Sequence, residues 1–335
     1  MPEGHSVHRI ARQFRRNFVG HRLEVTSPQG RFAEGASLLT GTVLLEAWAV
    51  GKQMFLGFEG ERWLRVHLGI YGAWDFSGEI HADATLASAN GRMGQTNQHG
   101  TVLDSADSDV VLDVDGENSL ASIGAPRKTR VRMAEAENVS AVDSASVFPP
   151  EPRGQVRVRL LSETACADLR GPTACEVLTR EQVDAVLLRL GPDPQHDPSD
   201  VSGQRFVDTI RTKKTAIGLL LMDQSVVAGI GNVYRAEILF RAGIDPYRPG
   251  NFVTVDEAWA LWRDWVYLLA IGVETGQMMT IDGLEGAAWK RAMARRIHRH
   301  WVYKREGLPC RNCGTHIRLD EMANRKLYWC PSCQT

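Results

Sequence analysis

With 335 residues, the chain is too long for one ordinary hydrophobic core and suits two or three domains. No apolar run approaches the ~18 residues of a membrane helix, and the arginine-rich start is unlike a signal peptide, so we expect a cytoplasmic protein without membrane contacts. The net charge of −1 hides an uneven distribution, because residues 285–335 hold eleven Lys and Arg against four Asp and Glu. This excess predicts a negatively charged partner for the carboxyl end.

The chain begins Met1-Pro2-Glu3. An initiator methionine is normally trimmed before a small residue, so we expect Pro2 to carry a free secondary amine. An α-amino group has a pKa of about 7.7 to 8 in model peptides, so part of it is unprotonated at neutral pH and can act as a nucleophile. The carboxyl group of Glu3, directly behind this amine, is a candidate proton donor.

One amphipathic helix is predicted after the terminus, from apolar residues at helical spacing: Val7, Ile10, Ala11, Phe14 and Phe18. Residues 21–76 form short β-rich runs punctuated by glycine, which predict an antiparallel sandwich. Residues 77–154 are rich in small and polar residues and predict a disordered insertion, after which the strand pattern resumes at QVRVRLLS. We therefore expect a multidomain α+β protein in which residues 1–176 form a β-sandwich domain flanked by helices.

Residues 177–285 show helical periodicity and predict a second, helical domain. Within it, Gly229-Ile230-Gly231 permits a tight turn just before a helix start, where exposed backbone N–H groups can bind a phosphate. The alternative interpretation is the plain corner of a helix-turn-helix.

The tail, residues 300–335, contains two CxxC pairs separated by sixteen residues: Cys310, Cys313, Cys330 and Cys333. This spacing predicts four thiolates around one structural Zn²⁺ in a zinc-ribbon finger, which has too few apolar residues to fold without the metal. A redox pair or a chance cluster is the alternative. Cations lie between the two pairs and favour contacts with phosphates.

Several segments together resemble the formamidopyrimidine-DNA glycosylase/endonuclease VIII family, in order and over nearly the whole chain outside the insertion: MPEGHS, the GK of VGKQMFLGF, HLGIYG, MDQSVVAGIGNVYRAEILFRAGIDP and REGLPCRNCG...RKLYWCPSCQ. The PEG opening is similar to the endonuclease VIII branch. The resemblance implies a helix-two-turn-helix middle domain and a bifunctional DNA glycosylase/AP lyase of base excision repair. Its expected substrate is damaged double-stranded DNA with oxidised pyrimidines, and we expect a monomer associated with the nucleoid.

The resemblance also implies residue roles. Pro2 would form a Schiff base with C1′ of the damaged nucleotide, and Glu3 would donate a proton. Lys52 would hold a phosphate and donate a proton in β-elimination, whereas Arg325 would bind phosphate and support δ-elimination. Asn232 would meet the phosphate beside the lesion. Taken without the family, Lys52 is a surface lysine, Arg325 a turn residue and Asn232 a helix N-cap.

Base removal from a duplex requires the damaged nucleotide to flip out, and a side chain then fills the gap. The resemblance gives this wedge role to Ile70 and Tyr71, which could instead be sandwich core, and a DNA contact to Arg170. Two residues depart from the family pattern. Ser6 replaces a second carboxylate near the terminus, and Gly69 replaces a polar residue at the start of the wedge.

Two other functions remain open. Small tautomerases also use an amino-terminal proline, as a general base, but they are much shorter and have no zinc ribbon. A second alternative is a zinc protein that binds damaged DNA without cutting it, because a retained Met1 would block the prolyl amine.

Overall fold

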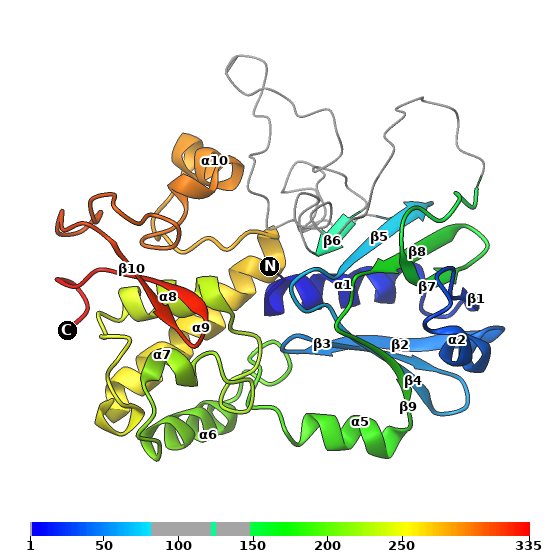
Figure 1. Cartoon of the computed structure of the whole chain (residues 1–335), viewed down its shortest axis with the longest axis horizontal. Coiled ribbons are helices and arrows are strands. Elements are labelled where there is room, and N and C mark those ends of the chain that lie inside the picture. The colour runs from blue at the N-terminus through cyan, green and yellow to red at the C-terminus, as the bar shows by residue number, and fades with distance from the viewer. Residues whose placement is uncertain (1, 82–121, 125–147) are drawn as a thin grey trace. The chain divides into compact units, whose positions relative to one another are not determined.

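The computed structural model describes residues 2–81, 122–124 and 148–335. They fall into two compact units, with the boundary between Leu188 and Arg189 (Figure 1). Most of the insertion predicted at 77–154 lies outside the described residues. No helix among the described residues is long and apolar enough to cross a membrane.

The first unit is an antiparallel sandwich, as the sequence predicts. Its strands are β1 (Arg22–Thr26), β2 (Thr42–Val50), β3 (Gln53–Phe58), β4 (Arg62–His67), β5 (Ala73–Gly78), β6 (Ser122–Gly124), β7 (Val156–Leu161), β8 (Ala165–Arg170) and β9 (Ala174–Leu178). One layer has the order β6-β5-β8-β7-β1 and the other the order β2-β3-β4-β9, and pairing between β1 and β2 joins them. Strand β6 lies within residues 77–154, which the sequence predicted to be a disordered insertion. The prediction missed this strand because three residues are too few to show the alternation of apolar and polar residues that marks a strand. Its Ile123 is fully buried and pairs with Trp74.

Helix α1 (Gly4–Asn17) packs into the core of this sandwich, between its layers (Figure 1). The fully buried ring of Phe14 lies 4.8 Å from the ring of Trp74 and 5.3 Å from that of Phe76. Burying one such side chain contributes about 1.5–3 kcal/mol. Apolar packing therefore fixes the helix, and with it the amino terminus of the chain, to a rigid scaffold.

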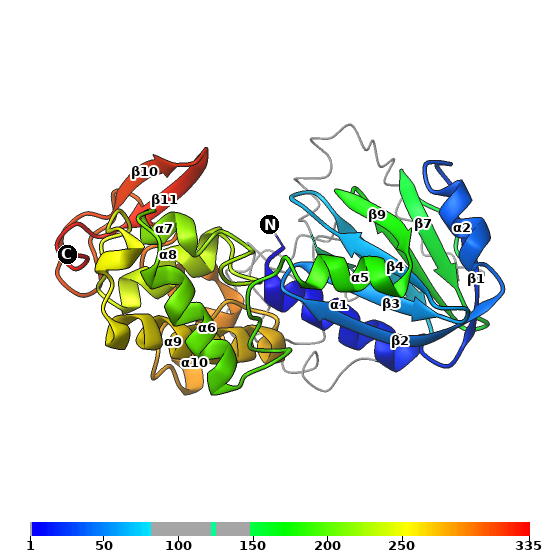
Figure 2. The same cartoon turned by 90° about the horizontal axis from the view of Figure 1, so that it is seen from below.

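Two short helices cover other parts of the sandwich, α2 (Ala33–Leu39) and α5 (Arg180–Leu187). The sequence assigns α5 to the helical domain, whereas in the structure it packs on β4 and β9 of the first unit (Figure 2). Its Val183 is fully buried beside Phe55 and Trp63. A Thr179–Gln182 capping box starts the helix.

The second unit combines a helical body with a ribbon. Its elements are α6 (Asp200–Arg211), α7 (Ile217–Leu220), α8 (Asn232–Arg241), α9 (Val255–Thr275), α10 (Gly286–Ala294), the 3₁₀ turns η1 (Gly250–Phe252) and η2 (Arg296–His298), and the strands β10 (Arg318–Met322) and β11 (Arg325–Trp329). Large buried side chains of α6, α8 and α9, among them Phe206, Tyr234 and Trp265, form the helical core. A smaller apolar cluster, which includes Phe240 of α8 and Tyr328 of β11, joins the ribbon to this body.

Candidate active site and metal centre

Pro2 and Glu3 are buried at the start of α1, and the Glu3 side chain has no exposed surface. Helix α1 runs antiparallel to β2, because the guanidinium of Arg15 donates to the carbonyl of Ala47 at 3.0 Å and Gly20 donates to the start of β2. With rises of ~1.5 Å per helical and ~3.3 Å per strand residue, the path from Arg15 back to Glu3 is about as long as the path from Ala47 to Lys52. The terminus and Lys52 therefore lie at the same end of the sandwich.

Lys52 lies in the two-residue turn between β2 and β3. The preceding Gly51 has φ +59°, a left-handed conformation that glycine adopts without strain. Across the β3–β4 pairing, His67 lies opposite Gln53, the residue after Lys52. Burial lowers the pKa of His67, and the positive charges of Lys52 and Arg65 lower it further. His67 therefore belongs to this end of the sandwich, a placement that its position directly before LGIYG could have indicated.

The loop after β4 presents Ile70 and Tyr71, each with 37% of its surface exposed. This loop lies beside the segment that follows β8, since Thr173 N–H donates to the carbonyl of His67 at 2.8 Å. A Cβ on Gly171 would come within 3.1 Å of the Tyr71 carbonyl oxygen. Two apolar side chains are therefore accessible on a closely supported loop and are not part of the sandwich core.

Arg170 has a different setting. It is the last residue of β8, its side chain is buried, and its guanidinium forms an ion pair with Asp75 on the neighbouring strand β5. A second contact, 3.4 Å long, reaches the carbonyl of Arg153. The guanidinium of Arg170 therefore contacts other residues of the first unit, on β5 and in the segment before β7.

The glycine turn before α8 is held by one amide side chain. Gln224 accepts from Gly229 N–H at 3.0 Å and donates to the carbonyl of Ile230 at 3.1 Å. Gly231 is the N-cap and Asn232 the first residue of the helix. Asn232 is therefore not the N-cap, and its side chain bonds elsewhere: its oxygen accepts from the guanidinium of Arg235, and its NH₂ group donates to the carbonyl of Lys326 in the ribbon at 2.8 Å.

Arg325 begins β11, directly after the hairpin turn of the ribbon. Ala323 and Asn324 form that turn with φ values of +49° and +58°, as a two-residue turn with two left-handed residues requires. Because Asn232 bonds to the residue after Arg325, the helix start and the ribbon turn meet at one place within the second unit. The two phosphate-binding residues predicted in this unit are therefore neighbours.

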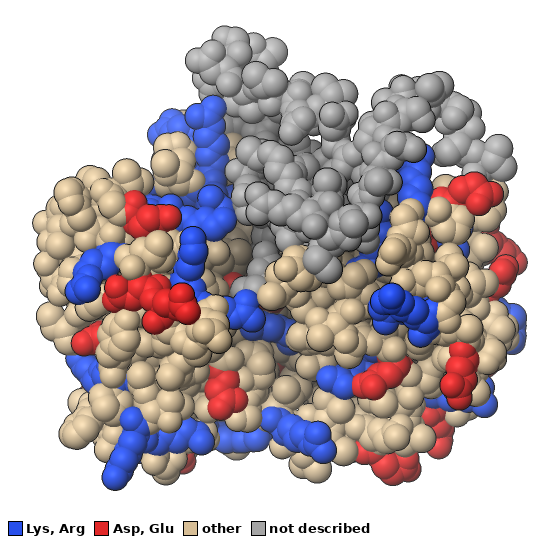
Figure 3. Space-filling model, in the orientation of Figure 1, with Lys and Arg blue, Asp and Glu red and all other residues tan. Residues whose placement is uncertain are grey.

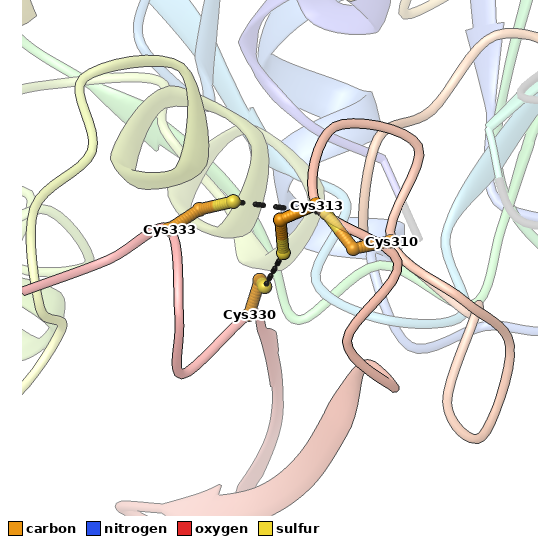
Figure 4. Close-up of side chains that lie close together, drawn as sticks. All are labelled: Cys310, Cys313, Cys330 and Cys333. Carbon is orange, nitrogen blue, oxygen red and sulfur yellow. Dashed lines mark hydrogen bonds between the residues drawn. The ribbon is translucent and has the colours of Figure 1, made fainter.

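The four tail cysteines converge, as Figure 4 shows. All four sulfur atoms lie within 4.8 Å of one another, with Sγ–Sγ distances of 3.8 Å between Cys310 and Cys333 and 3.5 Å between Cys313 and Cys330. Four thiolates at ~2.3 Å from a tetrahedral metal would be roughly 3.8 Å apart. Backbone and side-chain N–H groups of Asn312 donate to two of the sulfurs at 3.4 Å. The cluster fits one metal ion.

A buried carboxylate ties the segment before this metal centre to α8. Glu237 has no exposed surface and accepts from the backbone N–H groups of Trp301, Val302 and Tyr303 at 2.8–2.9 Å. It also accepts from the hydroxyl of Thr280. Burial raises the pKa of Glu237, and the four hydrogen bonds oppose that change. Its position in the chain carried no signal of this role.

Comparison with known families supports this architecture. The chain matches the formamidopyrimidine-DNA glycosylase N-terminal domain over residues 1–131, the H2TH domain of the same glycosylase over residues 190–282, and the zinc finger found in FPG and IleRS over residues 307–335. The three matches follow the order sandwich, helical body and ribbon.

Individual relatives of the chain come from the same family of glycosylases. Endonuclease 8 1 of Mycobacterium tuberculosis is 36% identical over 335 residues, with 100% of both chains covered. The formamidopyrimidine-DNA glycosylase of Thermus thermophilus is 37% identical over 156 residues, or 44% of this chain and 55% of that protein. The crystal structure of MutM (Fpg) from the same organism has a TM-score of 0.61 at 24% identity and covers 99% of this chain and 98% of that one.

The matched domains and the metal centre define a DNA glycosylase/AP lyase of base excision repair. The chain belongs to the formamidopyrimidine-DNA glycosylase/endonuclease VIII family.

Proposed function

We propose that the protein excises oxidised pyrimidines from double-stranded DNA, as a monomer, and then nicks the strand by β,δ-elimination. The observation that carries this proposal is the position of Pro2, Glu3 and Lys52 at one end of the sandwich, with the Ile70–Tyr71 loop beside them. The amine and the carboxyl group supply the nucleophile and the proton donor for displacement of a base from C1′, and the lysine supplies a proton donor for the elimination that follows.

In the proposed reaction, the amine of Pro2 attacks C1′, the bond from C1′ to the base breaks, and the base departs with the bonding electrons. Glu3 donates a proton that helps the sugar ring to open. The nitrogen then loses its proton, and its lone pair forms the C1′=N⁺ double bond of the iminium, the Schiff base, as the bond from C1′ to the ring oxygen breaks and that oxygen takes the proton of Glu3. Removal of a proton from C2′ then expels the 3′ phosphate, and Lys52 donates a proton in this step.

We assign DNA binding to residues of both units. Asn232 and Arg325 would contact the phosphates around the lesion, and Arg325 would also support δ-elimination. Ile70 and Tyr71 would fill the space that the flipped nucleotide leaves. To bind DNA directly, the Arg170 side chain would have to leave its ion pair with Asp75. We therefore assign Arg170 only a secondary contact with the DNA.

The metal is proposed to be one Zn²⁺, held by the four thiolates of the tail. Zinc favours four-coordinate tetrahedral thiolate sites, and the sulfur separations fit that geometry. When bound, the ion supplies structural stabilisation and no redox chemistry.

Borohydride trapping tests the proposal. The purified protein is incubated with duplexes that carry thymine glycol, 5-hydroxyuracil, 8-oxoguanine or an abasic site, and borohydride reduces any iminium to a stable covalent adduct. We expect adducts on both pyrimidine lesions and on the abasic site. Adducts on the abasic site alone would reduce the function to a lyase, and no adduct on any duplex would favour the damage-binding protein without catalysis.

A further inference from the structure

The loop that presents Ile70 and Tyr71 is tightly packed near its start. Gly69 has φ +63°, in the left-handed region that glycine adopts without strain. A Cβ atom on Gly69 would lie 1.8 Å from the hydroxyl oxygen of Thr173 and 3.0 Å from the Thr173 Cβ. Rotation of the hydroxyl would remove the first clash but not the second, since carbon atoms in contact are normally about 3.5–4.0 Å apart. The Thr173 side chain therefore occupies the space that a side chain at position 69 would need.

Thr173 is held beside this loop by its backbone. Its N–H donates to the carbonyl of His67 at 2.8 Å, and the next residue, Ala174, pairs with His67 across β4 and β9. Thr173 is exposed, and within the described ranges of the chain its hydroxyl makes no hydrogen bond. A hydroxyl group can both donate and accept. A polar group without a partner therefore lies beside the loop that carries the two accessible apolar side chains.

The gap in the duplex creates a need for such a group. When the damaged nucleotide flips out, the opposite base loses its pairing partner. A donor or acceptor that stays buried without a partner is costly, so the edge of that base requires new hydrogen bonds. Ile70 can fill the gap but offers no hydrogen bond, and the guanidinium of Arg170 is held by Asp75. The hydroxyl of Thr173 can supply a bond that these side chains cannot.

Charged side chains do not meet this need. Figure 3 shows Lys, Arg, Asp and Glu dispersed over the visible face of the first unit, with uncharged surface between them. Cations on this face can bind phosphates, which are the same for every nucleotide, whereas the bases differ in the donors and acceptors of their edges. An uncharged hydroxyl beside the wedge is therefore suited to contact a base.

We propose that Thr173 is a specificity-determining residue of the wedge, whose hydroxyl forms a hydrogen bond with the base opposite the lesion. The bond is made from the space that a side chain at position 69 would otherwise occupy, so Gly69 is what admits Thr173 to this position. The inference rests on the proposed function, because it requires a flipped nucleotide and a wedge formed by Ile70 and Tyr71.

Binding to a set of duplexes tests this contact. Each duplex carries a tetrahydrofuran abasic analogue, which cannot form a Schiff base, opposite A, C, G, T or a second tetrahydrofuran. Fluorescence anisotropy measures the affinity of the full-length protein for each of them. Thr173→Val removes the hydroxyl and keeps the shape of the side chain. We expect this variant to bind at least one of the duplexes with an opposite base about two- to tenfold more weakly, the effect of one hydrogen bond. Its affinity should be unchanged where no base lies opposite.

Three further variants make this result specific. Thr173→Ser keeps the hydroxyl and should retain the wild-type affinities. Thr164→Val removes an exposed hydroxyl from the turn between β7 and β8, at the other end of β8, and should change none of the affinities. Tyr71→Phe removes the other hydroxyl of this region and should not reproduce the dependence on the opposite base. The melting temperature of Thr173→Val should equal that of the wild type, because the residue is exposed.

An equal loss on all the duplexes, including the one without an opposite base, would overturn the contact. Wild-type affinities of Thr173→Val throughout, or the same base-dependent loss in Tyr71→Phe, would also overturn it. Borohydride trapping of the wild type on abasic DNA is measured in parallel. Trapping by a wild type whose affinities Thr173→Val does not change rejects the contact and leaves the proposed function intact. A wild type that neither traps nor binds DNA rejects both.

Discussion

The residues proposed for the chemistry and those proposed for phosphate binding both rest on apolar packing, but buried polar contacts contribute more to holding the second group. In the first unit, apolar packing around Phe14 fixes α1, so Pro2 and Glu3 are attached to a hydrophobic core. In the second unit, the apolar cluster that contains Phe240 and Tyr328 also joins the ribbon to the helices. Polar contacts add to it there: the Asn232 amide on the Lys326 carbonyl, the buried Glu237 and the four cysteines. We therefore expect changes at Pro2 and Glu3 to affect base excision, and changes at Glu237 or the four cysteines to affect mainly the affinity for DNA.

Glu3→Gln should cause the largest decrease in the rate of base excision, with almost no change in DNA affinity. Loss of a general acid costs about 10²–10⁴ in rate, so base excision should decrease by that factor under single-turnover conditions. Affinity for abasic-analogue DNA should stay within about twofold of the wild type, since the residue carries no phosphate contact. Equal losses of excision rate and of DNA affinity in Glu3→Gln would contradict the assignment of Glu3 to the chemical steps alone.

Loss of the metal centre should produce the opposite pattern. Cys330→Ser removes one of four ligands, and metal binding supplies about 10–16 kcal/mol to the folding of such small fingers. We expect the affinity for DNA to fall at least about tenfold, with amide exchange of the ribbon accelerated and that of the sandwich unchanged. Cys175→Ser is the control, because this cysteine belongs to β9 of the first unit and burial raises the pKa of its thiol to about 12. A ribbon that keeps its protection in Cys330→Ser would refute the metal assignment.

Glu237→Gln tests the hydrogen bonds between α8 and residues 301–303, and we expect a smaller effect than from loss of the metal centre. One carboxylate oxygen becomes an NH₂ group, which cannot accept from the N–H groups of residues 301–303. A buried donor left without a partner costs about 1–3 kcal/mol, so the free energy of unfolding of the second unit should fall by that amount in urea titrations. DNA affinity should weaken while the rate of base excision at saturating enzyme is retained. Glu274→Gln on α9 is a control in the same unit.

The smallest expected effect concerns His67. Burial and the charge of Lys52 lower its pKa, so NMR titration should give a midpoint below 6.5. Lys52→Met should raise this midpoint only partly, because burial is the larger cause. The unfolded chain binds a proton at His67 more readily than the folded one, so its contribution to stability is present above pH ~6.5 and is lost as the pH falls towards the folded value. An unchanged midpoint in Lys52→Met would show that the charge of Lys52 does not affect the pKa of His67, and would contradict their placement side by side.

The sequence was informative where chemistry imposes short, regular patterns. Short β-rich runs punctuated by glycine predicted the sandwich, and the spacing of Cys310, Cys313, Cys330 and Cys333 predicted one metal centre. These features depend on residues close together in the chain. The residue patterns also gave the order of sandwich, helical domain and zinc finger, and the family resemblance identified the middle domain as helix-two-turn-helix; the matches to known families confirm this architecture.

Other features depend on partners that are distant in the sequence. Asn232 looks like a helix cap, yet its amide bonds to Lys326, 94 residues away. Glu237 looks like an ordinary helix residue, and only the fold places three backbone N–H groups around it. Helix α5 follows the end of the strand pattern, so its packing on β4 and β9 was invisible in local periodicity. The roles of Pro2, Glu3, Lys52 and Arg325 remain predictions.

The most direct test of the account is to locate the covalent bond. The borohydride-trapped adduct on thymine glycol DNA is digested and its peptides are identified by mass spectrometry. We predict that Met1 is absent and that the modified peptide begins with Pro2 and carries the sugar on its amine. An adduct on Lys52 or another lysine, or full trapping by protein that retains Met1, would contradict it.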